Sequence, residues 1–598
     1  MLKTVVAIVL SVVAVALLSV PGLAKLEKAE MTTAAVIADA YSRGELSHAE
    51  MMLQKAYSVY APWRVREDFV GGVTDKCGSP IVDELRLALP DLPVDVADEI
   101  RELRARPSCA NYIETTHFRI HYDTSGTHAI LSTAYRDAIA THAENVWNEE
   151  IVTMGFRSPP PDGSDPDGGG GNDLYDIYVQ ELGAGLYGYC QPTYYYSGGG
   201  YPANAATSYI VIDNNYPYSQ FGYPDPVDPM KITVAHEFNH GVQGAHDVNE
   251  PTWYKECTST WIEDVVYDGV NDYRNYLPYF MNNTYQSLNY NPSGGLRWYG
   301  VCAWNFYLYE NYGYQIIVDN WYALEGSSNT FGLMDIVLGT YGSSMEEAYL
   351  DFAIWCWFCG TARDDGNHFE EGRYWDDISI MRGHNSYPTV IGVPTPGWEP
   401  DNYGCNYVVF NNTGGGYDGL LVEYDGPQPA STGNAAFLNY DSATGPTGEY
   451  GEIPLNGFGI GDLTVEGWDG MSQVGLVIAN TDASADNMSY SYTASQVETG
   501  IGEGNSVVAL KAASPNPFAE TTSIAYSVPT GGGLVDIVVY DVNGREVRTL
   551  VHENKGGGAG TVVWDGLDNT GERVASGVYF AKLDVDGLTA SGKLIMLK

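Results

Sequence analysis

The chain of 598 residues is 44% apolar, which is enough for several domains of the usual size, roughly 100–200 residues each. Its 30 basic and 76 acidic residues give a formal net charge of −46, which would repel nucleic acid and anionic lipid. The composition therefore predicts a folded multidomain protein with no nucleic-acid partner. Acidity alone names no substrate.

Residues 1–24 have the pattern of a secretory signal peptide. Lys3 gives a charged start, Val5 to Val20 form an apolar run, and Gly22-Leu23-Ala24 offers a small-residue cleavage site. An uncleaved membrane anchor is the alternative, because the apolar run is long for a signal. No other apolar stretch approaches the ~20 residues needed to span a bilayer. We therefore expect a soluble exported protein, secreted or attached to the cell surface.

The cysteine count is even in a chain expected to leave a reducing cytoplasm, which favours disulfides over free thiols. The pairing cannot be read from the sequence. A single Cys-x-x-Cys in WCWFCG suggests a redox site or half of a zinc site, but without a second pair a structural role is favoured. The eight cysteines are Cys77, Cys109, Cys190, Cys257, Cys302, Cys356, Cys359 and Cys405.

Residues 25–108 are predicted to form a helical N-terminal region. A first helix ends at Gly44, and a second begins where Ser47 and Glu50 have capping-box spacing, so the two form a helical hairpin. A further helical pattern covers residues 94–106. In an exported protein such a region is either a removable pro-region or a permanent helical cap.

Residues 109–385 are predicted to form an α+β domain, because strand alternation at 117–123 is followed by a helical pattern at 134–151. A loop rich in Pro, Gly and Asp then runs into a strand over residues 159–179. Its aspartates could gather around Ca²⁺, but they lack EF-hand spacing, and a solvated loop is the alternative. These aspartates are Asp162, Asp165, Asp167 and Asp173.

Beyond residue 385 the pattern becomes β-like, with Gly, Asn and Asp turns at short intervals. Residues 386–496 are predicted to form one antiparallel β-sandwich of immunoglobulin-like type. A linker over 495–506 separates it from a second such sandwich at 505–598, in which no catalytic cluster occurs.

The stretch VAHEFNHGVQGAHD, residues 234–247, contains two histidines four residues apart with a glutamate directly after the first. On a helix, His236 and His240 project from one face, where two imidazole nitrogens can reach one metal ion. Glu237 lies beside that face, placed to hold a metal-bound water and take its proton. The alternative is a surface helix that carries two histidines.

A zinc hydrolase needs a third protein ligand and one open position for water. Glu256 is the favoured candidate, in the helix-like run PTWYKECTSTWIEDVVYD (251–268), and Glu263 two turns further is an alternative. His246 is a further alternative for the third ligand, because it stands ten residues after His236, the spacing of the third ligand in metzincins. Gln243, however, occupies the position where that pattern has the glycine that turns the chain.

Three blocks occur in the order found in gluzincin-type secreted bacterial zinc metallopeptidases of the thermolysin-like clan, and they resemble that family. They are AHEFNHGVQ, WYKECTSTWIED and RWYGVCAWNFYLYENYG, and weaker likeness extends over residues 110–385. The resemblance implies a zincin-like fold and a peptide or protein substrate. Cys257 departs from it, since the family has glycine or alanine there. The implied zinc ligands are His236, His240 and Glu256, with Glu237 as the general base.

The implied activity is that of an endopeptidase in which Glu237 takes a proton from a metal-activated water and delivers it to the leaving amine. Tyr299 and His246 are candidate oxyanion donors. SYIVID (208–213) is a candidate edge strand for peptide binding by strand addition, with an ordinary interior strand as the alternative. The candidates for orienting the two imidazoles are Thr260, Glu263 and Asp264.

The last block resembles FlgD-like immunoglobulin-type domains and the C-terminal sorting domains of type IX secretion, through NPF, YDVNGREVRTL and SGVYFAKL. This resemblance implies a contact with the cell surface or the secretion machinery. The rival to the peptidase reading is a non-enzymatic adhesion protein with a degenerate metallopeptidase scaffold. The intact His, Glu, His and Glu positions count against degeneracy. Glycan binding through the tyrosine-rich segment 187–222 rests on composition alone.

Overall fold

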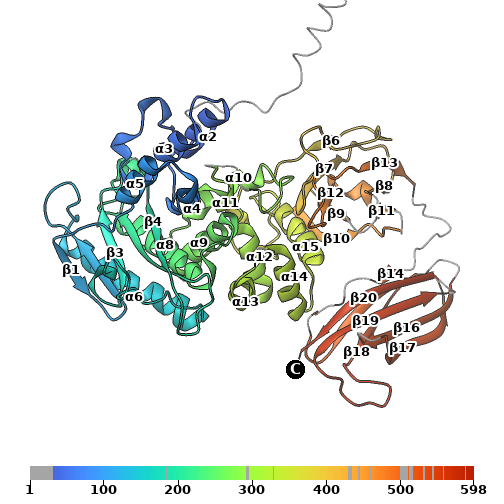
Figure 1. Cartoon of the computed structure of the whole chain (residues 1–598). Helices are drawn as coiled ribbons and strands as arrows, with labels where there is room; N and C mark the ends of the chain where they lie inside the picture. Colours follow the sequence, from blue (N-terminus) through green and yellow to red (C-terminus); the bar gives the residue numbers. More distant parts are fainter. Residues whose placement is uncertain are drawn as a thin grey trace, which may run out of the picture. The chain divides into compact units, whose positions relative to one another are not determined.

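The structure is a computed structural model of the chain, and its described residues form two compact units (Figure 1). One unit comprises Met1–Thr413, Val422–Leu463 and Met471–Thr493, and the other comprises Gly414–Leu421, Thr464–Gly470 and Ala494–Lys598. The predicted signal peptide and most of the predicted linker lie outside the described residues. Those residues are 31–597 without 184, 291–294, 328, 428–433, 442–444, 457–458, 499–508, 511–512, 514–515, 517, 529–531, 542–543, 557 and 586–587.

The N-terminal region is helical, as predicted. Thr32 caps the first helix, and the predicted capping box between Ser47 and Glu50 is present at the start of the second. The third predicted helix ends at Leu103, three residues earlier than the sequence pattern indicates. The helices are α2 (Thr33–Ser42), α3 (His48–Tyr60), α4 (Ser79–Ala88) and α5 (Val94–Leu103), joined in part by short 3₁₀ turns.

A five-stranded mixed sheet follows, with strand order β1-β2-β3-β5-β4. The strands β2, β3 and β5 are parallel to one another, while β1 and β4 are antiparallel to their neighbours. The strand β4 is therefore an edge of this sheet. The strands are β1 (Asn111–Glu114), β2 (Phe118–Tyr122), β3 (Tyr175–Gln180), β4 (Gly188–Tyr195) and β5 (Ala206–Asp213).

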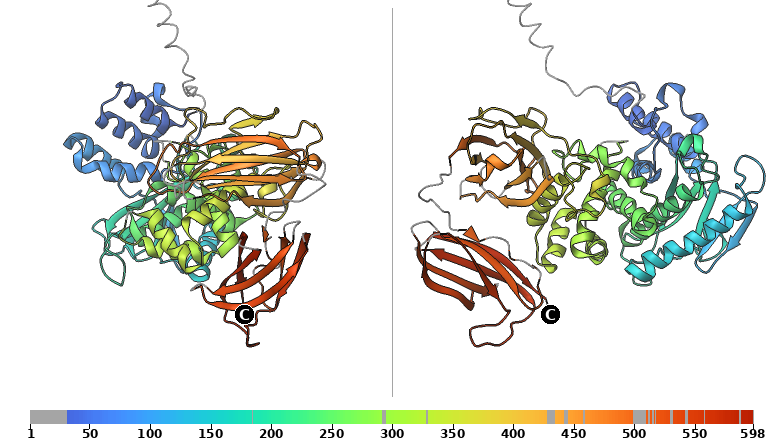
Figure 2. Two further views of the ribbon diagram at one scale, coloured as in Figure 1. Left: turned by 90° about the vertical axis from the view of Figure 1, so that its right-hand side faces the viewer. Right: turned by 180° about the vertical axis from the view of Figure 1, so that it is seen from behind.

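Helices cover both faces of this sheet (Figures 1 and 2). In β5, Ile210 and Ile212 pack with the helices that follow in the sequence, while Tyr209 and Val211 pack with the N-terminal helices. Successive side chains of a strand point to opposite faces, so β5 is buried along its whole length. The N-terminal region is therefore one complete layer of a helix–sheet–helix arrangement.

Of the two alternatives for residues 208–213, the interior strand is confirmed and the edge strand is wrong. These residues lie in β5, which pairs with β3 on one side and β4 on the other. The apolar run Tyr209–Ile212 indicates burial on both faces but does not say whether a strand is central. The edge belongs to β4, whose mixture of glycine, tyrosine and proline gives a weaker strand pattern.

The helix α8 (Val227–Asp247) packs against the sheet and carries the HExxH stretch. The helix continues through Gly241, and this glycine lies against Tyr175 of β3. A Cβ at Gly241 would lie 2.2 Å from the hydroxyl of Tyr175. Glycine thus allows α8 to pack closely on the sheet and does not end the helix.

The other helices complete this half of the unit. In the part of the chain that the structure describes, no helix combines the length and the apolar character that crossing a membrane requires. The helix α6 is followed directly by a π-helical turn, η5. The helices are α6 (Thr133–Trp147), η5 (Asn148–Met154), α7 (Tyr218–Phe221), α9 (Thr252–Tyr267), α10 (Leu277–Met281), α11 (Arg297–Gly300), α12 (Cys302–Tyr312), α13 (Gln315–Leu324), α14 (Thr330–Thr340) and α15 (Met345–Trp357).

In the described residues after α15, the strands pair antiparallel, apart from the parallel pair β6 and β7 and an isolated parallel bridge between Phe518 and Met596. The sheet orders are β10-β9-β12-β7-β6 and β11-β8-β13, then β14-β15-β18 and β17-β16-β19-β20. The strands are β6 (Arg382–His384), β7 (Gly404–Asn411), β8 (Gly419–Asp425), β9 (Asn434–Asp441), β10 (Gly445–Glu452), β11 (Ile460–Glu466), β12 (Gln473–Asn480), β13 (Ser491–Val497), β14 (Ala509–Leu510), β15 (Thr522–Val528), β16 (Gly533–Asp541), β17 (Glu546–Lys555), β18 (Gly558–Trp564), β19 (Gly577–Val585) and β20 (Leu588–Met596).

All eight cysteines are free thiols in the structure, so the disulfides favoured by their even number are not formed. Seven of them are buried, and several have local partners other than a second sulfur. Cys257, for example, donates to the carbonyl of Val301, and Cys405 donates to the hydroxyl of Tyr407. These buried thiols pack as small apolar groups, which needs no partner cysteine.

Candidate metal centre

Two consecutive helices bring three potential metal ligands together. His236 and His240 lie one turn apart on α8, and Glu256 lies on α9. The two Nε2 atoms are 3.2 Å apart, and the carboxylate of Glu256 lies 3.1 Å from Nε2 of His236 and 3.2 Å from Nε2 of His240. All three side chains are buried. The favoured third candidate thus faces both imidazoles.

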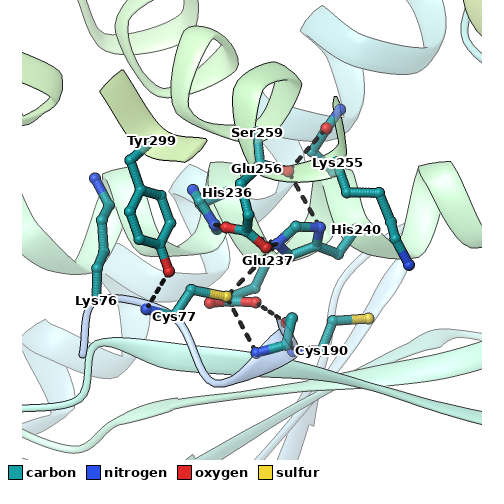
Figure 3. A network of polar contacts seen from close by, with 12 residues as sticks. Lys76, Cys77, Cys190, His236, Glu237, His240, Lys255, Glu256, Ser259 and Tyr299 are labelled. Atoms are coloured by element: carbon teal, nitrogen blue, oxygen red, sulfur yellow. Dashed lines mark hydrogen bonds and ion pairs between the residues drawn. The ribbon is translucent and has the colours of Figure 1, made fainter. Parts of the chain in front are cut away.

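A fourth potential ligand comes from the N-terminal region (Figure 3). Cys77 precedes α4, and its Sγ lies 3.5 Å from Nε2 of His240. Ligand atoms of Cys77, His236, His240 and Glu256 all lie within 4.8 Å of one another. Burial raises the pKa of the Cys77 thiol, and the nearby carboxylates of Glu237 and Glu256 raise it further. Without a cation in the cluster, this thiol would stay protonated.

The spacing of the four groups suits a tetrahedral metal ion. Zinc bonds of about 2.0–2.3 Å place the ligand atoms of a regular tetrahedron about 3.3–3.8 Å apart. The shorter separations, from 3.1 to 3.5 Å, lie within or just below this range, and all four ligand atoms lie within 4.8 Å of one another. Imidazole, thiolate and carboxylate are also the ligand types that zinc accepts. The lone pairs of the imidazole nitrogens, the carboxylate and the sulfur repel one another at these distances unless a cation lies between them. The four residues therefore fit a zinc ion.

The tautomer of His236 is fixed by a buried ion-pair network. Its Nδ1 donates to Glu263 at 2.6 Å, which leaves Nε2 to face the cluster. The other oxygen of Glu263 accepts from Lys76 at 2.7 Å, and Lys76 also donates to Asp272 at 2.6 Å. A histidine that donates its second N–H to a carboxylate is oriented and made a better ligand. Glu263 therefore orients a ligand and does not join the cluster.

The tautomer of His240 is fixed by a chain of amides. Its Nδ1 donates to Oε1 of Gln243 at 2.8 Å. The amide nitrogen of Gln243 donates to Oδ1 of Asn239 and to the carbonyl of Lys255, so Oε1 must face the imidazole. The amide nitrogen of Asn239 donates in turn to Glu150, which the π-helical turn η5 brings into the core. This series of hydrogen bonds leaves Nε2 of His240 facing the cluster, where it can bind a metal ion.

Without a metal, the cluster would hold a proton in its place. Burial lowers the pKa of His236, but the hydrogen bonds and charges of Glu256 and Glu263 outweigh it and raise that pKa to about 10. Burial raises the pKa of Glu256, but the two imidazoles outweigh it and lower that pKa to about 2. The site thus attracts positive charge strongly, as a metal site must.

Glu237 lies beside the cluster and is occupied by the N-terminal region. Burial raises its pKa, although His236 and His240 oppose this. The hydroxyl of Ser79 donates to Oε2 of Glu237 at 2.9 Å and accepts from the backbone N–H of Cys190 at 2.8 Å. In this structure, the carboxylate therefore contacts a serine where a catalytic base would contact water.

Tyr299 also faces the cluster, as the close view shows (Figure 3). It is fully buried on α11, and its ring centroid lies 6.2 Å from that of His236. Its hydroxyl accepts a hydrogen bond from the backbone N–H of Cys77 at 3.3 Å. The hydroxyl oxygen of Tyr299 thus lies between the N-terminal region and the cluster.

Three other candidates lie apart from the cluster. His246 contacts Glu325 at 2.9 Å through Nδ1 and accepts from the backbone of Arg157, so it supplies neither a ligand nor an oxyanion donor. Thr260 Oγ1 and Asp264 Oδ1 have no hydrogen-bond partner and do not orient an imidazole. Of the groups considered for that role, Glu263 alone contacts a histidine of the cluster.

The aspartates considered for Ca²⁺ do not converge on one point. Asp162 and Asp167 pair with the guanidinium of Arg106 at 2.9 and 3.2 Å, and Asp176 joins them at 2.6 Å. Asp165 instead accepts from two threonine hydroxyls, and Asp173 is exposed. In the part of the chain that the structure describes, an arginine supplies the positive charge at this loop, and only the cluster around His236 has metal-site geometry.

Sequence reasoning missed Cys77 and Gln243. The even cysteine count makes Cys77 a disulfide candidate, and nothing in the short motif DKCGSP indicates that it lies at the histidines. Gln243 was noted only as a departure from the metzincin glycine. An amide at i+3 from a ligand histidine on the same helix face can reach the imidazole, and this spacing was a usable signal.

Comparison with known proteins identifies one module. No curated protein matches the chain. PorZ, a surface component of the type IX secretion system of Porphyromonas gingivalis, is 20% identical over 18% of this chain and 14% of its own, with a TM-score of 0.12. Latent PorU of the same organism is 15% identical over 35% and 20%, with a TM-score of 0.15.

A β-galacturonidase from Eisenbergiella tayi is 9% identical over 32% of this chain and 34% of its own, with a TM-score of 0.13. The chain thus covers about a third or less of each of these proteins, and the low scores carry no functional argument. Residues 516–587, however, match the FlgD Ig-like domain family. The C-terminal part of this chain contains a FlgD Ig-like domain.

Proposed function

We propose that the protein is a zinc-dependent endopeptidase with a zincin-like catalytic domain. The observation that carries this proposal is the convergence of two Nε2 atoms and one carboxylate within 3.1–3.2 Å, with Glu237 directly beside them. His236, His240 and Glu256 would hold the ion. When bound, zinc supplies a Lewis acid that polarises a carbonyl and makes water a stronger nucleophile at neutral pH.

The chain's own residues have defined roles in this reaction. Glu237 accepts a proton from the attacking water and delivers it to the leaving amine. Tyr299 donates its O–H to the oxyanion that develops on the scissile carbonyl. Glu263 and Gln243 hold the two imidazoles in one tautomer throughout.

The substrate is proposed to bind along β4. This strand is an edge of the sheet, and Gly188 at its start lies close to the helix that carries Glu237. A Cβ at Gly188 would lie 3.0 Å from Cγ of Glu237, so the backbone approaches the catalytic carboxylate closely. An extended peptide paired with β4 would present its carbonyl groups beside the cluster.

Metal removal tests the proposed function. Because Cys77 lies at the cluster, casein hydrolysis is measured for the full chain and for the Cys77→Ala variant. We expect hydrolysis by Cys77→Ala to stop when a chelator removes the metal and to return when Zn²⁺ is restored. Hydrolysis that continues in chelator, or its absence from both zinc-loaded proteins, would exclude a zinc peptidase.

Replacing Gln243 tests the orientation of His240. In Gln243→Leu, the Nδ1–H of His240 loses its closer acceptor and keeps only the hydroxyl of Ser259 at 3.3 Å, and we expect zinc affinity to fall by about 10–100-fold. Competition with a chromogenic chelator measures this change. Gln220→Leu is the control, since Gln220 is exposed on α7 and should leave the affinity unchanged. Equal affinities in the two folded variants would show that Gln243 does not support the ligand.

We also propose that the chain is exported, on the basis of the signal pattern in residues 1–24. The FlgD Ig-like domain at residues 516–587 supports a contact with the secretion machinery or the cell surface.

A further inference from the structure

We propose that the N-terminal region keeps the catalytic site closed, with Sγ of Cys77 as the fourth ligand of the metal ion. This inference rests on the proposed function and adds its regulation. In this form the protein is latent, because the thiolate occupies the position that water must take. The segment that does this is Lys76–Ser79, which we call the blocking segment.

The blocking segment occupies the edge proposed for substrate. Cys77 forms a parallel bridge with Gly188 of β4. The N–H of Gly78 donates to the carbonyl of Gly188 at 2.9 Å, and the N–H of Tyr187 donates to the carbonyl of Lys76 at 3.1 Å. A peptide cannot pair with this part of β4 while the blocking segment is in place.

The same segment contacts both groups that are proposed to act on substrate. The hydroxyl of Ser79 donates to Glu237. The N–H of Cys77 donates to the hydroxyl oxygen of Tyr299 (Figure 3). In addition, the N–H of Ser79 donates to Sγ of Cys77 at 3.3 Å, which favours the thiolate form that binds metal. Four consecutive residues thus cover the ion, the base, the oxyanion donor and the edge strand.

Ion pairs before and after Cys77 hold the blocking segment in place. Lys76 is 3% exposed and lies between Glu263 and Asp272. Beyond the segment, Asp83 of α4 pairs with Lys255 of α9, the residue directly before Glu256. Cys77 is therefore placed by anchors before and after it, and its position at the cluster is a built feature of the fold.

Opening the site requires Sγ to leave the ion. The thiol loses a proton to solvent when it binds metal and takes one up again when it leaves, and water then fills the free position. A cavity of about 300 Å³ lies beside the blocking segment, lined in part by Cys77, Asp75, Leu296 and Tyr299. It provides room next to Cys77 for solvent or for a small thiol reagent.

X-ray absorption at the zinc edge tests the inference directly. In the zinc-loaded full chain we expect one sulfur at about 2.3 Å in addition to nitrogen and oxygen at about 2.0–2.2 Å. The sulfur should vanish in Cys77→Ala, while one zinc per chain remains bound. Cys109→Ser is the matched control, since Cys109 contacts Gln180 and lies outside the cluster. It should keep the sulfur.

Activity and thiol labelling give the second reading. We expect casein hydrolysis to be higher for Cys77→Ala than for the full chain or Cys109→Ser, and zinc to protect Cys77 from alkylation. A full chain whose zinc has only nitrogen and oxygen neighbours would overturn the inference, even if it is an active peptidase. A zinc–sulfur bond that depends on Cys77 in a chain without any hydrolysis would leave the closed site intact and refute the proposed function instead.

Discussion

Glu237→Gln, made in the Cys77→Ala variant, is expected to lower kcat for peptide hydrolysis by about 10²–10⁴-fold. Glutamine has nearly the same shape, but its amide cannot accept the proton of the attacking water. The hydroxyl of Ser79, which contacts Glu237 at 2.9 Å, can still donate to the amide oxygen, so the fold should persist. Zinc content should remain at one ion per chain, because Glu237 is not among the clustered ligand groups.

The control for this prediction is Glu370→Gln in the same variant. Glu370 is exposed, so the substitution removes the same charge without touching the cluster. We expect its kcat to match that of Cys77→Ala. Full activity in Glu237→Gln would end the assignment of Glu237 as the general base.

Lys76→Met is expected to destabilise the protein by about 3–5 kcal/mol, the second large effect. Lys76 is buried and pairs with Glu263 and Asp272, which are also buried. Burial lowers the pKa of Lys76, but the two carboxylates outweigh this and raise it, so the lysine remains charged. Methionine fills a similar volume and leaves two carboxylates without their cation, which is the costly way to break a buried ion pair.

Urea unfolding followed by intrinsic tryptophan fluorescence measures this loss, and Lys231→Met provides the comparison. Lys231 pairs with Asp228 at 2.7 Å, but both side chains are partly exposed, so this substitution should cost only about 0–1 kcal/mol. If the two variants unfold at the same urea concentration, Lys76 is not an anchor of the blocking segment.

Local patterns in the sequence predicted much of the secondary structure. The capping box at Ser47 and Glu50 is present because it depends on residues three apart, which one short stretch of chain can specify. The same holds for His236 and His240, since helical spacing alone puts them on one face. The FlgD Ig-like domain carries enough motif to be identified from the sequence.

The parts that sequence reasoning missed depend on contacts between distant segments. Cys77 reaches His240 across 163 positions of sequence, and Lys76 reaches Asp272 across 196. Periodicity carries no information about such pairs. The sequence left residues 208–213 undecided between an edge strand and an interior strand for a related reason, because the order of strands in a sheet is set by how the whole chain packs. The even cysteine count misled because a thiol can be buried without a covalent partner.

The layer formed by α2 to α5 limits the ways in which the proposed closed site can open. It buries Tyr178, Tyr189, Tyr209 and Val211 on one face of the five-stranded sheet β1-β2-β3-β5-β4. Removing residues 31–106 entirely would expose these four side chains to water, and the remaining protein would become less stable and prone to aggregation. In the proposed latent form, the region that closes the site therefore also covers the sheet. A nick in the connection after α5 would leave the two fragments associated, and a shift of the blocking segment within an otherwise intact fold is the less costly route to an open site.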